Sequence, residues 1–445
     1  MAYITRDRFS VNGSGVKVGV IADGIKDRQV VQTAGELPSI NTVHAGDPNG
    51  NEGTAMLEIV YDIAPSSQLY FAGLNLATDG PNVMASRIDA LWNNGCRVIV
   101  DDIGYSDEPF FSDQSALGTA IRNFISYGNT YVSAAGNDAQ RLYNSSTNFF
   151  GTDSLHRFSG SADSVTFTLP ASTNTEVVLQ WASNWLFPEM DIDLYVFNSA
   201  GQRVGSGGTT RQNANNPPFE RVTGVSSGSS SQTFTVRIKW YGGSQQNGIE
   251  FSLWIPQGTT TNSGTRHIFG HPAYPNVISV AAYHFDNQNS LATYSSKGPS
   301  SMYVSQPTGQ WTTQNTPAIT ATSKVKTYVG ITGLWPPGNP YFEGTSASAP
   351  HMAGIAALYY ERFPSKNNQD FFNDLTSTAT TIATGSGGTW NNQSGYGKAN
   401  AYEAVIKGLP VLNNPNVTAN TSWNGVRITG TAQISNGAQV VVPSG

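Results

Sequence analysis

The chain has 445 residues, enough for two or three domains with substantial hydrophobic cores. Only 12% of the residues are charged and the net charge is -6 at pH 7, a balance that argues against nucleic acid as a partner. The sequence holds neither a run of basic residues nor an apolar stretch of about 18 residues, so we expect no polybasic patch and no membrane span.

The first buried strand is predicted at residues 16–22, a short apolar run rich in Val and Ile. Asp23 and Gly24 follow at its end. Sites in open α/β sheets are built at the carboxyl ends of strands, which makes Asp23 a candidate site residue. The alternative is an aspartate that only forms a turn before the glycine.

A helix is predicted to begin at Glu52, because apolar residues recur at helical spacing between positions 56 and 63. An Ala-Pro pair ends this helix, and the next strand begins at residues 68–72. The loop before the helix, at about 42–51, contains His44.

Another helix is predicted at 82–95, followed by a strand at 97–100 that ends at two carboxylates, Asp101 and Asp102. We expect Asp101 to lie in a solvated loop. The single cysteine, Cys96, stands just before this strand, where we expect a buried thiol. One cysteine excludes an internal disulfide framework and a cysteine-based zinc site.

A helix at about 114–127 precedes a predicted strand and turn at 131–137. Asn137 ends this segment and is a second candidate at a strand end; an ordinary turn asparagine is the alternative.

The α/β pattern stops at about 155–258, where predicted strands follow one another without helices. Apolar and polar residues alternate, as they do at 191–197, and Gly, Ser and Asn residues fill the turns. We therefore predict an all-β sandwich inserted into an α/β domain. Asp191 and Asp193 project to one face of their strand, where they form either a calcium site or a solvated surface.

The stretch Gly344–Gly354 places Ser346 at the start of a buried helix, with apolar residues at helical spacing behind it. A helix start carries unpaired N–H groups and positive dipole charge, which suit an anionic tetrahedral intermediate. A Thr-Ser helix cap without chemistry is the alternative. The whole stretch, however, resembles the nucleophile motif of the subtilase family of serine peptidases, and sedolisins, which share that fold, carry a close relative of it.

The resemblance extends over about 16–150 and 265–408, and it implies a three-layer α/β fold with a parallel sheet flanked by helices. We expect residues 1–150 and 262–408 to form one catalytic domain around an inserted sandwich at 155–258. The insert resembles the small β-sandwich accessory domains of many secreted peptidases. Residues 410–445 are predicted to be a linker and the start of a further β module.

The resemblance also implies roles for single residues. Ser346 matches the nucleophile, Asp23 the catalytic aspartate and Asn137 the oxyanion-hole asparagine of subtilases. The helix that begins with histidine in subtilases begins here with Glu52, which matches the catalytic glutamate of sedolisins. The partner aspartate of sedolisins, four residues later, is Met56 in this chain.

The family's substrate pocket has counterparts in this sequence as well. Asp102 takes the place of a pocket serine and is a candidate accessory acid beside Glu52. The remaining pocket positions suggest a site for an uncharged or apolar side chain: Ile103, Gly104, Tyr105, Ala134, Ala135 and Gly136.

The sequence thus predicts a serine-carboxyl endopeptidase that forms an acyl-enzyme on Ser346, with Glu52 as general base and an acid-leaning pH optimum. His351 is one helical turn beyond Ser346 and matches a structural histidine of the family, and His44 is the less favoured alternative base. An inactive pseudopeptidase that binds protein or glycan is the main alternative function, and an esterase or peptide ligase is a further one. We expect a protein or peptide substrate, no required cofactor, and a secreted or cell-surface location, with signal and propeptide removed.

Overall fold

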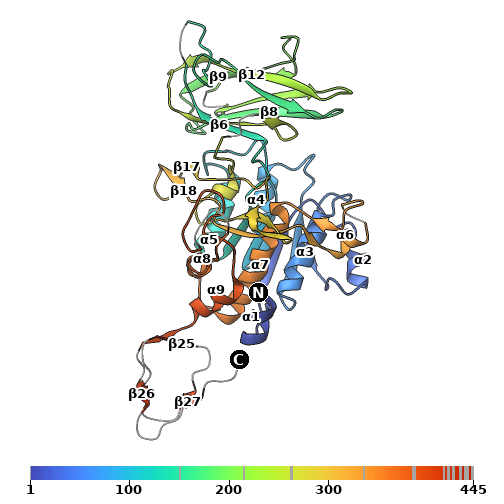
Figure 1. Cartoon of the computed structure of the whole chain (residues 1–445), viewed down its shortest axis with the longest axis vertical. Helices are drawn as coiled ribbons and strands as arrows, with labels where there is room; N and C mark the ends of the chain where they lie inside the picture. The colour runs from blue at the N-terminus through green and yellow to red at the C-terminus, as the bar shows by residue number, and fades with distance from the viewer. Residues whose placement is uncertain are drawn as a thin grey trace.

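The computed structural model describes residues 2–149, 152–213, 216–260, 264–333, 336–382 and 387–413, and beyond them 416–417, 421–422, 426–429, 433–434 and 440–441. An α/β unit fills the middle of the molecule, and a β-sandwich lies at one end of its long axis (Figure 1). Both units were predicted from the alternation of elements along the sequence.

The α/β unit is built on a largely parallel sheet. From one edge inward, its strands are β2 (Asn41–Ala45), β3 (Gln68–Gly73), β1 (Lys17–Ile21), β4 (Val98–Asp101), β5 (Thr130–Ala134) and β15 (Ile278–His284). Beside β15, β19 (Ile319–Ser323) pairs in parallel and β16 (Asn287–Leu291) pairs antiparallel. The continuous apolar runs arise because both faces of such a sheet are covered.

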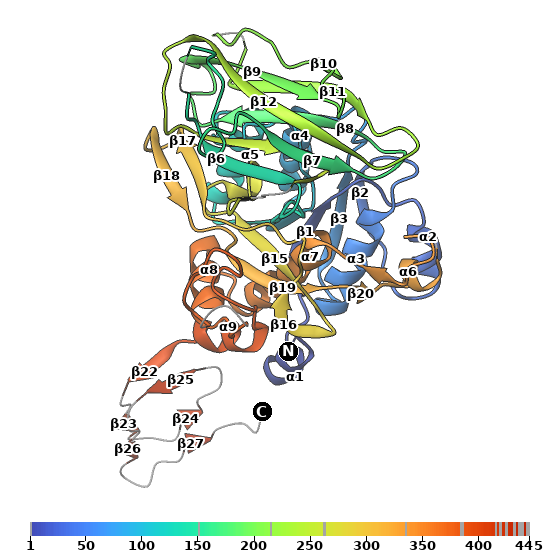
Figure 2. The same ribbon diagram turned by 45° about the horizontal axis from the view of Figure 1, so that its top comes forward.

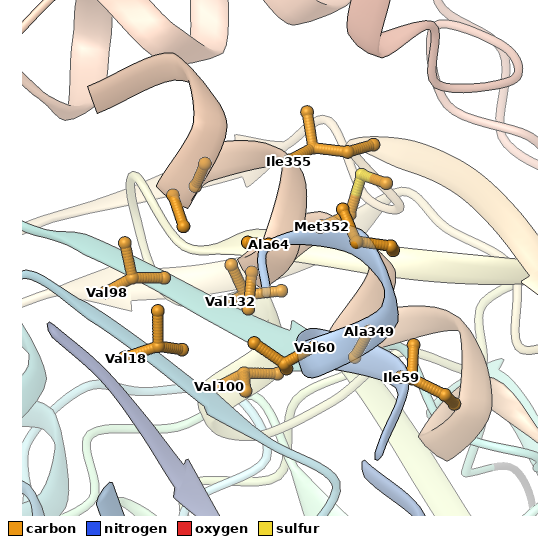
Figure 3. Close-up of a cluster of buried hydrophobic side chains, with 14 of the residues drawn as sticks. Val18, Ile59, Val60, Ala64, Val98, Val100, Val132, Ala349, Met352 and Ile355 are labelled. Atoms are coloured by element: carbon orange, nitrogen blue, oxygen red, sulfur yellow. The ribbon is translucent and has the colours of Figure 1, made fainter. Parts of the chain in front are cut away.

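Helices cover both faces of this sheet and complete three layers. On one face lie α3 (Glu52–Ile63) and α7 (Thr345–Arg362), and on the other α4 (Pro81–Asn93) and α5 (Ala116–Ser126). Figure 3 shows the first interface, in which valines of the strands face apolar side chains of the two helices. The strand residues are Val18, Val98, Val100 and Val132, and the helix residues are Ile59, Val60, Met352 and Ile355. Cys96 is buried, as predicted.

The crossing of α3 and α7 depends on a glycine. A Cβ atom at Gly354 would lie 2.7 Å from the Ile63 side chain, so only glycine lets the two helices approach this closely. The contact lies at the last residue of α3 and in the middle of α7, whereas Glu52 and Ser346 stand at the amino ends of these helices.

The sandwich consists of two antiparallel sheets that share a hydrophobic core (Figure 2). One contains β10 (Ser206–Gly207), β11 (Phe219–Ser226), β8 (Asn174–Trp181), β13 (Glu250–Trp254) and β6 (Leu142–Ser146). The other contains β14 (Thr259–Thr260), β7 (Val165–Leu169), β12 (Gln232–Gly243) and β9 (Met190–Phe197). Because β6 and β14 take part, the strands of the sandwich extend beyond the predicted limits of 155–258.

Smaller elements complete the α/β unit: α1 (Ala2–Phe9), α2 (Arg28–Thr33), the hairpin β17 (Ser300–Val304) and β18 (Gln310–Gln314), β20 (Val325–Lys326) with β21 (Tyr341–Phe342), α6 (Tyr328–Ile331), α8 (Asn368–Ser377) and α9 (Ala401–Gly408). Within the part of the chain that the structure describes, none of the helices combines the length and apolar character that a membrane span requires.

The predicted linker and β module at 410–445 lie largely outside the described residues. Short parallel pairs are described there: β22 (Val411–Asn413) with β25 (Arg427–Thr429), β23 (Asn416–Val417) with β26 (Gln433–Ile434), and β24 (Thr421–Ser422) with β27 (Val440–Val441). They lie beyond α9, at the end of the molecule opposite the sandwich (Figure 2).

Candidate active site

The candidate site lies where the carboxyl ends of parallel strands meet the amino ends of two helices. Asp23 follows β1, Asp102 follows β4 and Asn137 follows β5, while Glu52 begins α3 and Ser346 lies in the first turn of α7. Parallel strands end at one edge of their sheet, so residues far apart in sequence converge there. Asp102, Asn137 and Ser346 line one cavity of about 190 Å³.

Ser346 is presented by a turn that requires glycine. Gly344, the residue before α7, has φ of 107°, a conformation that side-chain-bearing residues rarely adopt. Ser346 is itself only 8% exposed, and its backbone N–H is among the first of the helix, which have no partner within it. The hydroxyl therefore stands beside an unpaired N–H donor and the positive end of the helix dipole.

Asn137 is oriented by the residue next to Ser346. Its side-chain oxygen accepts hydrogen bonds from the backbone N–H of Thr345 at 3.0 Å and from the Thr345 hydroxyl at 3.2 Å. The Thr345 hydroxyl also accepts from the Gly136 N–H at 3.1 Å. With its oxygen held in this way, the amide of Asn137 keeps its two N–H donors for a group bound beside Ser346.

Asp23 acts on the amino end of α3 rather than on a side chain. One oxygen of its carboxylate accepts the backbone N–H of Glu52 at 2.9 Å and that of Gly53 at 3.4 Å. Asn51, at the cap position, makes no side-chain cap, so Asp23 supplies the acceptor that this helix start needs. Burial raises the pKa of Asp23, while these N–H groups oppose the rise.

The Glu52 side chain lies among three other candidate site residues, Ser346, Asp102 and Asp23. Its carboxyl group lies within hydrogen-bonding reach of the Ser346 hydroxyl and of the Asp102 carboxyl. Burial raises the pKa of Glu52; the hydrogen bond with Asp102 opposes this rise, and the charge of Asp23 adds to it. The partner of the Glu52 carboxyl is thus Asp102, whereas Asp23 acts through the backbone and through its charge.

Asp102 and Glu52 bring two carboxyl groups together beside Ser346. Both Asp102 oxygens are buried and receive no hydrogen bond from an N–H or hydroxyl group among the described residues. Burial and the charge of Glu52 raise the pKa of Asp102 well above its ordinary value. The hydrogen bond between the two carboxyl groups raises the pKa of Asp102 and lowers that of Glu52, so of the two groups Asp102 holds a proton more strongly.

His351 was expected to be a structural histidine, and His44 was the less favoured alternative base. The Nδ1 atom of His351 is 2.8 Å from the backbone oxygen of Ala347, and burial lowers the pKa of His351 to about 4. His44 is exposed on the edge strand β2, where its charged neighbours are Arg87 and Asp79.

The expected solvated position of Asp101 is wrong. Asp101 is fully buried, and its carboxylate lies 3.0 Å from Nε2 of His271, which begins the short 3-10 helix η1 (His271–Ala273). The other ring nitrogen of His271 is 2.8 Å from the Glu108 carboxylate. Burial lowers the pKa of His271, but the charges of Glu108 and Asp101 outweigh it and raise the pKa to about 10. This cluster was missed because His271 is 170 residues from Asp101, and no local spacing connects them.

The predicted pocket residues fall into two neighbouring cavities. Five of the six line the cavity beside Ser346: Ile103, Gly104, Ala134, Ala135 and Gly136. Tyr105 lines the second cavity, which lies against the sandwich. Sequence reasoning missed Trp254, an aromatic residue of the sandwich that lines both cavities. Its position at the end of an alternating strand gave no signal of contact with the α/β unit.

The proposed calcium residues lie in the sandwich, away from the candidate site. Asp191 and Asp193 are 6% and 4% exposed, so the solvated face weighed as an alternative is wrong. The Tyr195 hydroxyl donates to Asp193 at 2.7 Å. Among the described residues, no three His, Cys, Asp or Glu side chains are grouped to hold a metal ion. Calcium binding here stays a prediction.

Known proteins resemble this chain in sequence and in fold. Residues 41–397 match the subtilase family of peptidases, S8. The chain is 33% identical to alkaline elastase YaB of Bacillus sp. (strain YaB) over 147 residues, which are 32% of this chain and 31% of that protein. It is 27% identical to subtilisin Savinase of Lederbergia lenta over 207 residues, 42% of this chain and 66% of that protein.

Among solved structures, the chain resembles the Clostridium perfringens CspB protease with a TM-score of 0.61 at 15% identity. The match covers 91% of this chain and 96% of that one. This likeness confirms the predicted fold, a parallel sheet flanked by helices with additional antiparallel sheets. The curated relatives named above are matched over less than two thirds of their own length.

Proposed function

The chain belongs to the subtilase family, and we propose that it is a serine endopeptidase in which Glu52 takes the histidine's place as general base. The observation that carries this proposal is the position of the Glu52 carboxyl, within hydrogen-bonding reach of the Ser346 hydroxyl at the meeting point of α3 and α7. A base must reach the proton that it removes, and Glu52 meets this requirement.

In the proposed reaction, the Ser346 oxygen attacks the carbonyl carbon of the scissile peptide bond while Glu52 takes the hydroxyl proton. The side-chain amide of Asn137 and the backbone N–H of Ser346 donate to the oxyanion that forms. Glu52 then gives its proton to the leaving amine, and the acyl group remains on Ser346. Water, activated by Glu52, attacks the acyl-enzyme and releases the second product.

A glutamate needs help to serve as this base. Free glutamate has a pKa of about 4.3 and histidine of about 6.5, so an unperturbed glutamate is a poorer base by about 3 kcal/mol. Burial and the Asp23 charge raise the pKa of Glu52 and narrow this gap. The surroundings thus supply part of the basicity that the substitution of histidine removes.

We infer that the activity leans toward acidic pH. The singly protonated Glu52–Asp102 pair is the working state, and ionisation of both groups places two negative charges side by side. The substrate is a protein or peptide, as the family implies, and we propose that the site of action is outside the cell.

The test is cleavage of casein from pH 3 to 9, together with labelling of Ser346 by a fluorophosphonate. We compare wild type with Ser346→Ala and Glu52→Gln. The proposal expects acid-leaning cleavage and labelling in wild type, and loss of both in each variant. Labelling that persists at the wild-type rate in Glu52→Gln rejects Glu52 as the base. A folded wild type that neither cleaves nor labels at any pH favours the binding-protein alternative.

A further inference from the structure

The cavity beside Ser346 adjoins a second cavity of about 380 Å³, and two residues, Gly104 and Trp254, line both. Gly104 has no side chain, so the indole of Trp254 is the side chain that divides them. Trp254 ends β13 and therefore belongs to the sandwich, whereas Ser346 belongs to the α/β unit. The second cavity also contains Glu176 and Arg221 of the sandwich.

The Trp254 indole is held in one orientation. Its Nε1–H donates to the Asp138 carboxylate at 2.8 Å, and Asp138 directly follows Asn137 in the chain. The ring meets those of Phe269 and Phe110 edge to face, at centroid separations of 5.5 Å and 6.4 Å. A hydrogen bond at the edge and aromatic contacts on the ring fix both its tilt and its depth.

The sandwich is also fastened to the loop that forms the opposite wall of the cavity. Gln180 of β8 is 1% exposed; its side-chain oxygen accepts the Phe110 N–H at 2.8 Å, and its amide donates to the Glu108 carbonyl at 2.8 Å. Arg221 of β11 donates to the Ser106 hydroxyl at 2.7 Å. Trp254 and the loop at 102–110 are therefore held in one rigid arrangement.

We propose that the inserted sandwich is a working part of the substrate site and that Trp254 determines its specificity. The indole closes the cavity and limits the substrate side chain bound beside Ser346 to a medium-sized apolar one. The charged groups of the lining support an uncharged occupant, because Glu108 is paired with His271, and Asp138 accepts the Trp254 N–H and has the charge of Arg141 nearby. This inference rests on the proposed peptidase function.

The test uses a series of peptides that differ only in the residue before the scissile bond: Ala, Leu, Phe and Trp. Wild type is expected to prefer Leu. Trp254→Ala joins the two cavities and should shift the kcat/KM ratio of Phe or Trp over Leu by about 10-fold or more. Trp254→Phe should shift it less in the same direction. Tyr241→Ala, which removes an aromatic ring that is 67% exposed on β12, is the matched control and should change nothing.

An unchanged preference in Trp254→Ala, with wild-type melting temperature and wild-type labelling of Ser346, overturns this inference alone. If Trp254→Ala fails to fold, an unchanged preference in Trp254→Phe has the same meaning. A wild type that neither cleaves nor labels overturns the proposed function, and with it this inference.

Discussion

The substitution Asp102→Asn removes one of the two titrating carboxyl groups at the proposed base, so that the titration of Glu52 can be followed alone. Asparagine keeps a donor for Glu52, through its amide N–H, but it cannot ionise. In wild type, the pair should lose two protons at two macroscopic pKa values, and activity should belong to the state between them. The variant should retain the acidic limb of the pH–rate profile and lose the alkaline one.

The separation of the two limbs follows from the charges. Carboxylates within hydrogen-bonding reach hold their charges about 4 Å apart, which costs about 4 kcal/mol at an effective dielectric constant of about 20. One pKa unit corresponds to about 1.4 kcal/mol, so the limbs of the wild-type profile should lie about 3 pH units apart. Both residues are half-buried and the pKa of each is raised, so both limbs should lie above the pH at which free carboxyl groups titrate.

The assay is kcat/KM on a fluorogenic peptide from pH 3 to 10, supported by the rate of Ser346 labelling at each pH. Asp107→Asn removes an exposed carboxylate from the same loop and should leave both limbs in place. An alkaline limb that survives unchanged in Asp102→Asn refutes the reasoning, because the group that titrates there is then not Asp102. A folded variant that is inactive at every pH refutes it as well.

Three further changes test the geometry around the pair. Asn137→Ala should lower kcat by about 10²- to 10³-fold with little change in KM, measured by steady-state kinetics. Gly344→Ala places a Cβ 3.2 Å from the Asn137 amide at a positive φ, and it should cost about 1–2 kcal/mol in urea unfolding and lower kcat. His271→Gln leaves two buried carboxylates unpaired and should cost about 3–5 kcal/mol at neutral pH. Because the folded pKa of His271 is raised to about 10, its contribution is complete below about pH 6.5 and is lost as the pH rises through 10. Unfolding free energies that show no such loss in wild type contradict this assignment.

The helices and strands of the α/β unit could be predicted from the sequence because the spacing of their apolar residues matches the faces that they bury. The helix predicted from Glu52 is observed as Glu52–Ile63, since its apolar period and the Ala-Pro pair mark both its face and its end. Placing Asp23 and Asn137 at one edge needed only the rule that parallel strands end together, whereas Ser346 was predicted at a helix start. The family resemblance then supplied the roles that spacing alone left open.

What the sequence concealed are contacts between distant segments. Asp101 follows an apolar strand as a loop aspartate would, and its partner His271 comes from the far side of the insert. The strand β6 is short and half polar, and it is recognisable only by its pairing with β13, about 100 residues later. In the sequence, Trp254 is only the last residue of an alternating strand. Its ring lines the cavity beside Ser346 because the sandwich packs against the α/β unit.

The proposed exchange of histidine for glutamate as the general base would change what the residues around the base must do. A histidine becomes a cation when it takes the serine proton, so a neighbouring anion stabilises it. A glutamate becomes neutral, so neighbouring anions help by raising its pKa, and a neighbouring cation would lower it. The nearby cation, His271, lies between two carboxylates, and Asp101 is among the groups that raise the pKa of Asp102. The acidic lining of this edge suits the proposed carboxyl base, because it raises the pKa of Asp102 and so favours Glu52 as the group that would accept the proton of Ser346.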